Sequence, residues 1–408
     1  MVDVIIIGGG AAGLACGIEA VKRGKTCLIL EQKEKLGKKL YATGNGKCNF
    51  ANRNVELQWF HSVEENAEPL IADVIHEDIC GEIEHFFYEL GVPAVERQGY
   101  LYPRSEQAAT VVRALVQAYI QRKGTIKCGE RVEKLHWSEQ KKEFTVQTDA
   151  GVYKSKKIVL ATGGMSNSKL GSDGSGYGLA KQLGHGVTAC LPALCGLQCK
   201  EKGWNRLQGV RARGTVQAWI NHNLLAEEQG EIQFTQYGIS GIVVFNLSRY
   251  ASIGLQEGKK VEFVLDLLPE YSKEEFKNML LDMQKFCPNR SVYEIVSGFL
   301  PDKLAAYLLE RIGLQKEQLI RDCQEPTLKE LIQTCKCLKV RIVDSNDFNQ
   351  SQVTAGGVPL SEVNLNTMES KIQSGCYLTG ELLDVDGSCG GYNLMWAWST
   401  GRRAGQNL

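Results

Sequence analysis

The sequence has no long apolar run, no excess of charge of either sign and no segment that reads as an export signal. The apolar stretches are shorter than the roughly 18–20 residues that cross a bilayer. The run at residues 4–7 follows an acid and is too short for the apolar part of a signal peptide. Lys and Arg number 47, as do Asp and Glu, so the basic excess typical of nucleic-acid binding is missing. We therefore expect a cytoplasmic protein without a membrane segment or a nucleic-acid partner.

Clustered metal ligands are also missing. The 14 cysteines are scattered, and neither Cys195 with Cys199 nor Cys335 with Cys337 belongs to a paired Cys-x-x-Cys pattern. The 6 histidines show no His-x-x-x-His spacing. We expect most thiols to be reduced and packed as small apolar side chains. The sequence predicts no metal site and no catalytic triad.

Glycine, in contrast, is concentrated at the start of the chain. Residues 4–7 are a β-branched run typical of a buried parallel strand, and Gly8, Gly10 and Gly13 follow with the spacing G-x-G-x-x-G. A helical apolar repeat and a second strand ending at Glu31 complete the unit.

Each residue type in this unit has a physical role in dinucleotide binding. Gly8 permits a tight turn, Gly10 lets a pyrophosphate approach the backbone, and Gly13 lets the helix pack against the strand. The helix N-terminus attracts phosphate, and the carboxylate of Glu31 can accept hydrogen bonds from ribose hydroxyls. The motif predicts dinucleotide binding but does not distinguish FAD from NAD.

Three later segments carry a resemblance to known flavoproteins. Residues 37–52 are rich in Gly, Asn, Thr and Lys, residues 156–164 read as a buried strand ending in Ala-Thr-Gly-Gly, and residues 375–405 read as a strand, an acid, a glycine turn and a helix starting near Gly391. With the opening unit, they resemble a family of bacterial FAD-dependent flavoproteins that includes aminoacetone-oxidase-like proteins and 3-dehydro-bile acid delta(4,6)-reductases. Further matching segments are 99–105, 171–180, 234–241 and 354–358, so the resemblance covers essentially the whole chain.

This resemblance implies FAD as the cofactor and assigns its contacts by position. The opening glycines would face the pyrophosphate, Glu31 the adenosine ribose, and the Val132 backbone the adenine. Gly380 and Glu381 would meet the ribityl chain and phosphates. The last helix would point its N-terminus at the flavin N1–C2=O edge, where reduced flavin carries negative charge. The expected cofactor-binding residues are Gly8, Gly10, Ala11, Ala12, Gly13, Glu31, Gln32, Lys38, Lys39, Thr43, Gly44, Asn45, Gly46, Cys48, Asn49, Val132, Ala161, Thr162, Gly163, Gly164, Gly380, Glu381, Gly390, Gly391, Tyr392 and Asn393.

The resemblance also implies a flavin reaction. We expect NAD(P)H to reduce the flavin, which then passes hydride to a conjugated ketone, such as a 3-oxo-4,6-diene bile acid intermediate. The sequence leaves open an oxidase of a small amine such as aminoacetone, and a flavin-binding redox sensor without turnover. The candidate proton donors are Tyr102, Arg104, Tyr237 and Tyr392, although a buried tyrosine is more often a hydrogen-bonded core residue.

The expected fold is α/β. A Rossmann-like FAD-binding domain of the two-dinucleotide-binding-domain flavoprotein type would span residues 1–190 and 345–408. A β-barrel-like domain would be inserted at residues 191–268 and a helical cap at 269–344. Strands are predicted at 215–221, 231–236, 241–248 and 260–267. Ser272 with Glu275, and Pro301 with Asp302, are signals of helix starts. No second G-x-G-x-x-G marks a separate NAD domain, and the oligomeric state is not fixed.

Overall fold

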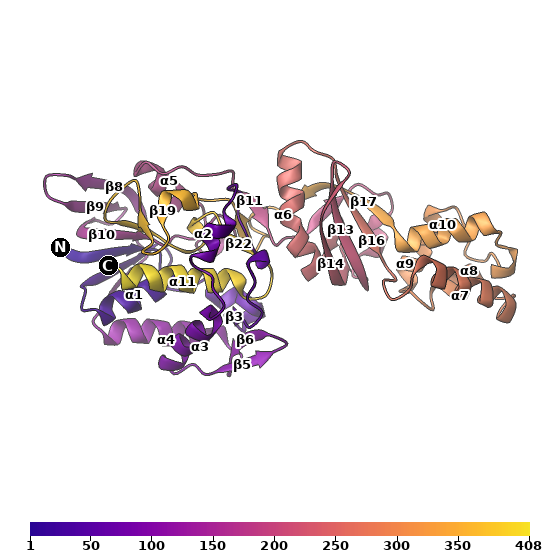
Figure 1. The fold of residues 1–408 in the computed structure, drawn as a ribbon, viewed down its shortest axis with the longest axis horizontal. Coiled ribbons are helices and arrows are strands. Elements are labelled where there is room, and N and C mark those ends of the chain that lie inside the picture. The colour runs from indigo at the N-terminus through magenta and orange to yellow at the C-terminus, as the bar shows by residue number, and fades with distance from the viewer. The chain divides into compact units, whose positions relative to one another are not determined.

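The computed structural model describes residues 1–408, which separate into two compact units. The first unit combines two segments that are far apart in the sequence, Met1–Pro192 and Phe348–Leu408. The second is the segment between them, Ala193–Asp347. In Figure 1 the indigo and yellow ends of the chain belong to the same unit. The boundaries within the second unit, between a β-rich and a helical part, stay a prediction.

A nine-stranded sheet runs through the first unit and is parallel at its centre. Strand β1 pairs in parallel with β10 and β2, which pair in parallel with β21 and β7. The strands, in spatial order, are β19 (Val363–Asn364), β20 (Glu369–Ser370), β21 (Cys376–Leu378), β10 (Val152–Leu160), β1 (Val2–Ile7), β2 (Cys27–Glu31) and β7 (Thr125–Cys128), with β9 (Glu143–Thr148) on β10 and β8 (Val132–Ser138) on β9. Every residue of β2 is buried, as expected for a parallel strand that is covered on both faces.

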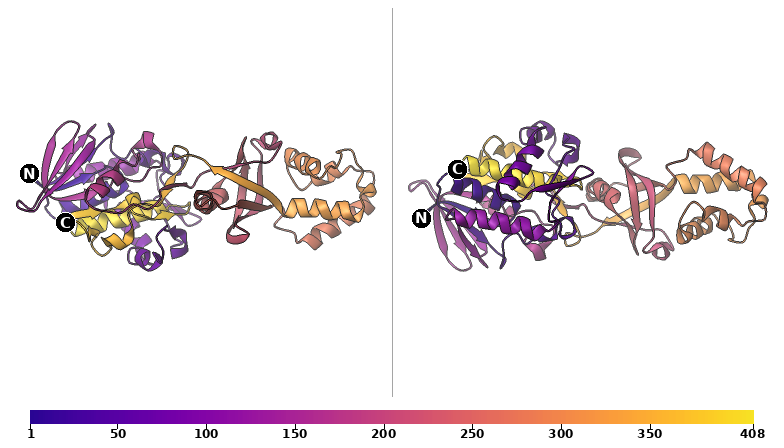
Figure 2. Two further views of the ribbon diagram at one scale, coloured as in Figure 1. Left: turned by 90° about the horizontal axis from the view of Figure 1, so that it is seen from above. Right: turned by 90° about the horizontal axis from the view of Figure 1, so that it is seen from below.

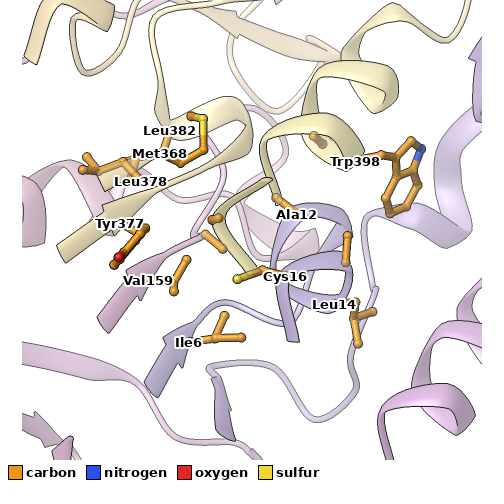
Figure 3. Packing of buried hydrophobic residues seen from close by; sticks show 14 of the residues in the cluster. Ile6, Ala12, Leu14, Cys16, Val159, Met368, Tyr377, Leu378, Leu382 and Trp398 are labelled. Atoms are coloured by element: carbon orange, nitrogen blue, oxygen red, sulfur yellow. The ribbon is translucent and has the colours of Figure 1, made fainter. Parts of the chain in front are cut away.

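The two ends of the chain meet where helices α1 (Ala11–Lys22) and α11 (Tyr392–Gln406) pack backbone to backbone. A Cβ at Gly401 would lie 2.3 Å from the Ala12 carbonyl oxygen, and one at Gly405 would lie 2.3 Å from that of Cys16. Figure 3 shows Ala12 and Cys16 in one core with side chains of the sheet and of α11. The C-terminal helix, yellow, stays with the indigo segment in both views of Figure 2. Only glycine allows this helix contact.

Further short elements surround this core. The other helices of the first unit are α2 (Glu68–Ala72), α3 (Ile79–Glu89), α4 (Ala108–Gln121) and α5 (Ser175–Gln182). A small sheet joins β3 (Ala51–Asn52), β6 (Tyr100–Pro103) and β5 (Ala94–Arg97), and another joins β4 (Phe60–His61) to β22 (Asp386–Gly387). Strand β18 (Val353–Ala355) also belongs to this unit, and β11 (Leu191–Ala193) lies at the boundary between the units.

A closed antiparallel barrel forms one part of the second unit, which confirms the expected barrel-like insert. Its strands follow one another in the order β12 (Leu197–Cys199), β15 (Gly238–Ser240), β14 (Asn223–Phe234), β13 (Arg211–Ile220), β16 (Val261–Asp266) and β17 (Leu338–Ser345). Alternate residues of β13 and β16 are buried, as expected where one face of each strand fills the barrel.

One sequence prediction in the barrel is wrong. Residues 241–248 were expected to form a strand, but helix α6 (Ile242–Gln256) begins there. Its buried residues include Val243, Val244, Leu247 and Ala251, which share one helical face. The run of Val and Phe at residues 243–245 also suits a buried strand. The spacing of apolar residues over all fifteen is helical.

The helical part of the second unit has the helix starts that the sequence predicts. Its helices are α7 (Lys273–Phe286), α8 (Val292–Val296), α9 (Asp302–Arg311) and α10 (Glu325–Lys336). Ser272 and Glu275 form the expected capping box at the start of α7, and Pro301 precedes α9. No helix in the structure is both long and apolar enough to cross a membrane.

Candidate functional site

The three glycines of the opening motif have two different roles. Gly8 and Gly13 are required for close packing, whereas Gly10 leaves open space beside the start of α1. Gly8 has a φ of +105°, and a Cβ on it would lie 2.4 Å from the Ala161 carbonyl oxygen. A Cβ on Gly13 would lie 2.0 Å from the Gly8 carbonyl oxygen. In contrast, a Cβ on Gly10, the N-cap residue of α1, would meet nothing within 4 Å. The turn therefore leaves open space beside the N-terminus of α1, where unpaired backbone N–H groups suit an anionic phosphate.

Glu31 holds this turn in place from the end of β2. Its Oε2 accepts a hydrogen bond of 2.8 Å from the Gly9 N–H, and its Oε1 accepts one of 2.8 Å from the Lys33 N–H. Burial raises the pKa of the Glu31 carboxyl, against the lowering effect of these two hydrogen bonds. The Gly37 N–H donates to the Gly9 carbonyl oxygen at 2.8 Å. Glu31 thus fixes the position of the glycine turn, and its carboxylate lies at the edge of the sheet where a ligand can bind.

A pocket opens beside Glu31. It brings together five residues that the sequence assigned to the cofactor, namely Gly8, Glu31, Gln32, Val132 and Thr162. Its other lining residues, which the sequence did not assign, are Ile7, Leu30, Glu130, Arg131, Gly171, Ser175 and Leu179. Residues 31, 132 and 162 come from three distant stretches of the chain. Glu31 ends β2 and Thr162 follows the end of β10 in the parallel part of the sheet, whereas Val132 begins β8, which pairs antiparallel with β9.

Polar contacts cross the rim of this pocket. Gln32 Nε2 donates to the Gly171 carbonyl oxygen at 2.7 Å, and Arg131 Nη1 lies 2.9 Å from Asp173 Oδ2. Asp173 also accepts from the Ser175 N–H at 3.0 Å at the start of α5. Asp173 therefore orders the turn before α5, whose N-cap residue is Gly174. Gly171, Ser175 and Leu179, from the segment 171–180 that matches the family, line the same pocket as Glu31.

A second group of assigned residues gathers around Glu381. Lys39 Nζ lies 2.8 Å from Glu381 Oε2, and the Thr354 N–H donates to Glu381 Oε1 at 3.0 Å. A Cβ on Gly164 would lie 2.6 Å from Thr354 Oγ1 and 3.0 Å from Glu381 Oε1. Gly164, which lies beyond the end of β10, therefore makes room for these two side chains. The sequence did not assign Thr354 to the cofactor, although Thr354 begins the segment 354–358 that matches the family.

The third group lies at the N-terminus of α11. Gly390 and Gly391 have φ values of +132° and +99°, and Gly391 is the N-cap residue. Asn49 Oδ1 is buried without a hydrogen-bond partner, and it lies 3.0 Å from the position of a Cβ on Gly391. An unpaired buried acceptor is unfavourable by about 1–3 kcal/mol, so this atom is ready to accept from a ligand N–H.

The other assigned residues have identified positions. Ala11 and Ala12 form the first turn of α1, and Lys38 pairs with Glu34 at 2.9 Å. Thr43 Oγ1 donates to the Leu40 carbonyl oxygen at 2.7 Å, and Asn393 makes two hydrogen bonds to the Gly387 backbone. Gly44, Asn45 and Gly46 have positive φ values. The segment that follows the end of β10 contains Ala161, Thr162 and Gly163. The Gly380 N–H donates to Thr400 Oγ1 at 3.0 Å. Burial raises the pKa of the Cys48 thiol to about 12, so this thiol stays protonated.

The candidate proton donors do not form one group. The Tyr392 hydroxyl donates to the Asn54 carbonyl oxygen at 2.9 Å, and its ring stacks on Trp59, so it has a structural role. Tyr237 belongs to the second unit and is 67% exposed. Tyr102, on β6, lies with Cε1 at 3.7 Å from the position of a Cβ on Gly44. Arg104 is exposed just beyond β6.

The three groups fit FAD by the chemistry of their donors and acceptors. Open space at Gly10 suits the diphosphate, the Glu31 pocket suits a nucleoside with hydroxyl donors, and the unpaired Asn49 acceptor suits a ring N–H. No group of three or more His, Cys, Asp or Glu side chains is arranged to hold a metal ion.

Comparison with known proteins agrees with this geometry. The chain is 41% identical over 404 residues to the 3-dehydro-bile acid delta(4,6)-reductase of Clostridium scindens, covering 98% of this chain and 97% of that protein. It is 29% identical to a ribosomal RNA dihydrouridine synthase of Haemophilus influenzae, covering 97% and 96%. Among solved structures, the 3-ketosteroid delta1-dehydrogenase of Sterolibacterium denitrificans has a TM-score of 0.51 at 13% identity, covering 99% of this chain and 98% of that one. This last likeness concerns the fold alone.

A family model described as the HI0933-like protein Rossmann domain matches residues 2–407. The match takes in both segments of the first unit and the whole inserted unit. The chain therefore belongs to the HI0933-like family of FAD-binding Rossmann proteins and is an FAD-dependent oxidoreductase.

Proposed function

We propose that this protein reduces a carbon–carbon double bond conjugated with a ketone, in a steroid such as a 3-oxo-4,6-diene bile acid, with NAD(P)H as the electron donor. The observation that carries the substrate class is the 41% identity to the bile acid reductase over nearly the full length of both chains. The net reaction adds a hydride from NAD(P)H and a proton from a side chain or water across the double bond. FAD, when bound, supplies the hydride-transfer chemistry.

The residues of the first unit would divide the work of binding. Glu31 and the Val132 segment would hold the adenosine end, and the turn at Gly10 the diphosphate. The first turn of α11, with its N-cap at Gly391, would hold the end of the cofactor that becomes negatively charged, because a helix N-terminus has a partial positive charge.

Tyr102 is the proton donor that the contacts favour. Its hydroxyl makes no hydrogen bond within the protein, whereas the Tyr392 hydroxyl already donates a hydrogen bond to a backbone carbonyl oxygen. Tyr102 also lies beside Gly44, in the loop assigned to the cofactor. A tyrosine hydroxyl can donate a proton to the carbon or carbonyl oxygen of an enone, which is general acid catalysis.

The direct test is anaerobic turnover by the purified holoenzyme. NADH or NADPH is mixed with a 3-oxo-4,6-diene bile acid, and we expect the dienone absorbance to disappear while the product mass increases by two hydrogens. Persistence of the dienone with both nicotinamides, and with dithionite as reductant, contradicts the proposal. Peroxide formed from aminoacetone in air instead indicates the amine oxidase.

A second candidate follows from the relatives named ribosomal RNA dihydrouridine synthase. Forming dihydrouridine also saturates a double bond conjugated with a carbonyl, so the same flavin site would serve. The equal numbers of basic and acidic residues favour the steroid over RNA. Dihydrouridine formed in protein-free ribosomal RNA, without loss of the dienone, supports the second candidate. The cytoplasmic location and the capping role of α7–α10 stay predictions.

A further inference from the structure

An ion pair joins the N-terminal and C-terminal segments of the first unit. Lys39 Nζ lies 2.8 Å from Glu381 Oε2, and the two residues are 342 positions apart in the sequence. The second carboxylate oxygen accepts the Thr354 N–H at 3.0 Å. The side chains of Lys39 and Glu381 are 26% and 19% exposed. The carboxylate is therefore partly desolvated, and both of its oxygens have partners.

Lys39 and Glu381 each follow a segment that contacts the glycine turn or the first turn of α1. Gly380, which precedes the acid, approaches the first turn of α1, because its Cβ position lies 3.0 Å from Ala12 Cβ. On the other side, Gly37, two residues before the lysine, donates its N–H to the Gly9 carbonyl oxygen at 2.8 Å. Both partners thus follow segments that are in contact with the glycine turn.

A carboxylate at this place is unfavourable for an anionic ligand unless its charge is cancelled. FAD brings a dianionic diphosphate, and like charges in a partly desolvated site repel strongly. We propose that Lys39 is a positioning residue that cancels the charge of Glu381, so that the acid can join the two chain segments without repelling the diphosphate. This inference concerns FAD binding and does not depend on the steroid substrate.

The proposal predicts an unusual relation between single and double variants. Lys39→Gln leaves the carboxylate of Glu381 without its countercharge, and losing one partner of a desolvated pair is more harmful than losing both. We expect Lys39→Gln to raise the dissociation constant of FAD about tenfold or more, and Lys39→Gln/Glu381→Gln to restore it to within about threefold of the native value. A pair that served stability alone would not show this restoration in FAD affinity.

The experiment is a titration of the FAD-free proteins with FAD, followed by the quenching of flavin fluorescence. Lys22→Gln is the matched control, because Lys22 is also 26% exposed and pairs with Glu89 at 3.0 Å, near the end of α1 opposite to Gly10. Thermal unfolding of each FAD-free variant is measured in parallel, so that a loss of folding is recognised and the affected variant is compared at a lower temperature.

Two outcomes overturn the proposal. In the first, Lys39→Gln binds FAD as tightly as Lys22→Gln. In the second, the double variant binds FAD no more tightly than Lys39→Gln, which means that the loss does not come from an uncompensated carboxylate at Glu381. Neither outcome affects the proposed steroid reaction, which is tested by turnover of the native holoenzyme.

Discussion

Replacing Gly10 with alanine tests whether the open space beside α1 is the diphosphate site. The added Cβ meets no atom within 4 Å, so the FAD-free fold should tolerate it. An alanine at an N-cap is less favourable than glycine by up to about 1 kcal/mol. For a unit of this size that corresponds to a decrease in melting temperature of roughly 2–4 °C at most. In the FAD complex, however, the methyl group takes space that the diphosphate needs.

The expected effect on binding is large compared with that on folding. Forcing one methyl group into a filled space typically costs about 1–3 kcal/mol, which corresponds to a roughly 5- to 150-fold weaker binding of FAD. Gly13→Ala should behave differently, because its Cβ would lie 2.0 Å from the Gly8 carbonyl oxygen. That variant should lose folding stability and FAD affinity together.

The assay pairs FAD titration with thermal unfolding of the FAD-free protein. Gly178→Ala in α5 is the control, since its Cβ also meets nothing within 4 Å and it lies at a helical position; it should retain native affinity and gain up to about 1 kcal/mol of stability. Native FAD affinity in Gly10→Ala would refute the placement of the diphosphate. So would a large loss of stability in the FAD-free Gly10→Ala protein, because the turn would then be needed for folding alone.

Three further predictions concern single side chains. Tyr102→Phe should lower kcat about 10²- to 10⁴-fold if its hydroxyl is the general acid, while Tyr392→Phe should lower mainly the melting temperature. Steady-state kinetics and thermal unfolding distinguish the two variants. Equal kcat values for Tyr102→Phe and the native protein would contradict the assignment. Burial raises the pKa of Glu31, so the folded protein holds this proton more tightly than the unfolded chain. The free energy of unfolding should therefore fall as pH rises from its usual pKa of 4.5 toward the raised value, and Glu31→Gln should remove that part of the slope in denaturant titrations of the FAD-free protein. Asn49→Ala removes an unpaired buried acceptor, so it should weaken FAD binding without lowering the stability of the FAD-free protein; unchanged FAD affinity would mean that Asn49 does not contact the cofactor.

The parts of the site that the sequence predicts are those built from neighbours in the chain. The turn at Gly8 and Gly13 depends on backbone conformations and close approaches within a few residues, so the spacing of glycines is enough to identify it. The same holds for the capping box at Ser272 and the helix that begins after Gly391. In each case the chemistry of a short segment selects one local structure.

The parts that the sequence does not predict depend on residues brought together by the fold. The contact between Lys39 and Glu381 spans 342 positions, and nothing near either residue indicates the other. Thr354 and Arg131 are missed for the same reason, because each meets the site from a distant segment. The wrong strand at 241–248 has a different cause. A short run of Val and Phe suits either a strand or a buried helix, and the helical spacing of apolar residues is visible only over the full length of α6.

The two ends of the inserted unit lie side by side. The strands that enter and leave the insert, β12 and β17, pair with each other, with Leu197 opposite Ser345. Just outside this pair, the Asn346 N–H donates to the Gly196 carbonyl oxygen at 2.9 Å. Because the two ends of the insert are held side by side, the insert can change in sequence or shape without moving the segments that precede and follow it. The helix contact at Gly401 and the pair at Lys39 and Glu381 lie wholly within the first unit. The residues assigned to the cofactor therefore all lie outside the inserted unit.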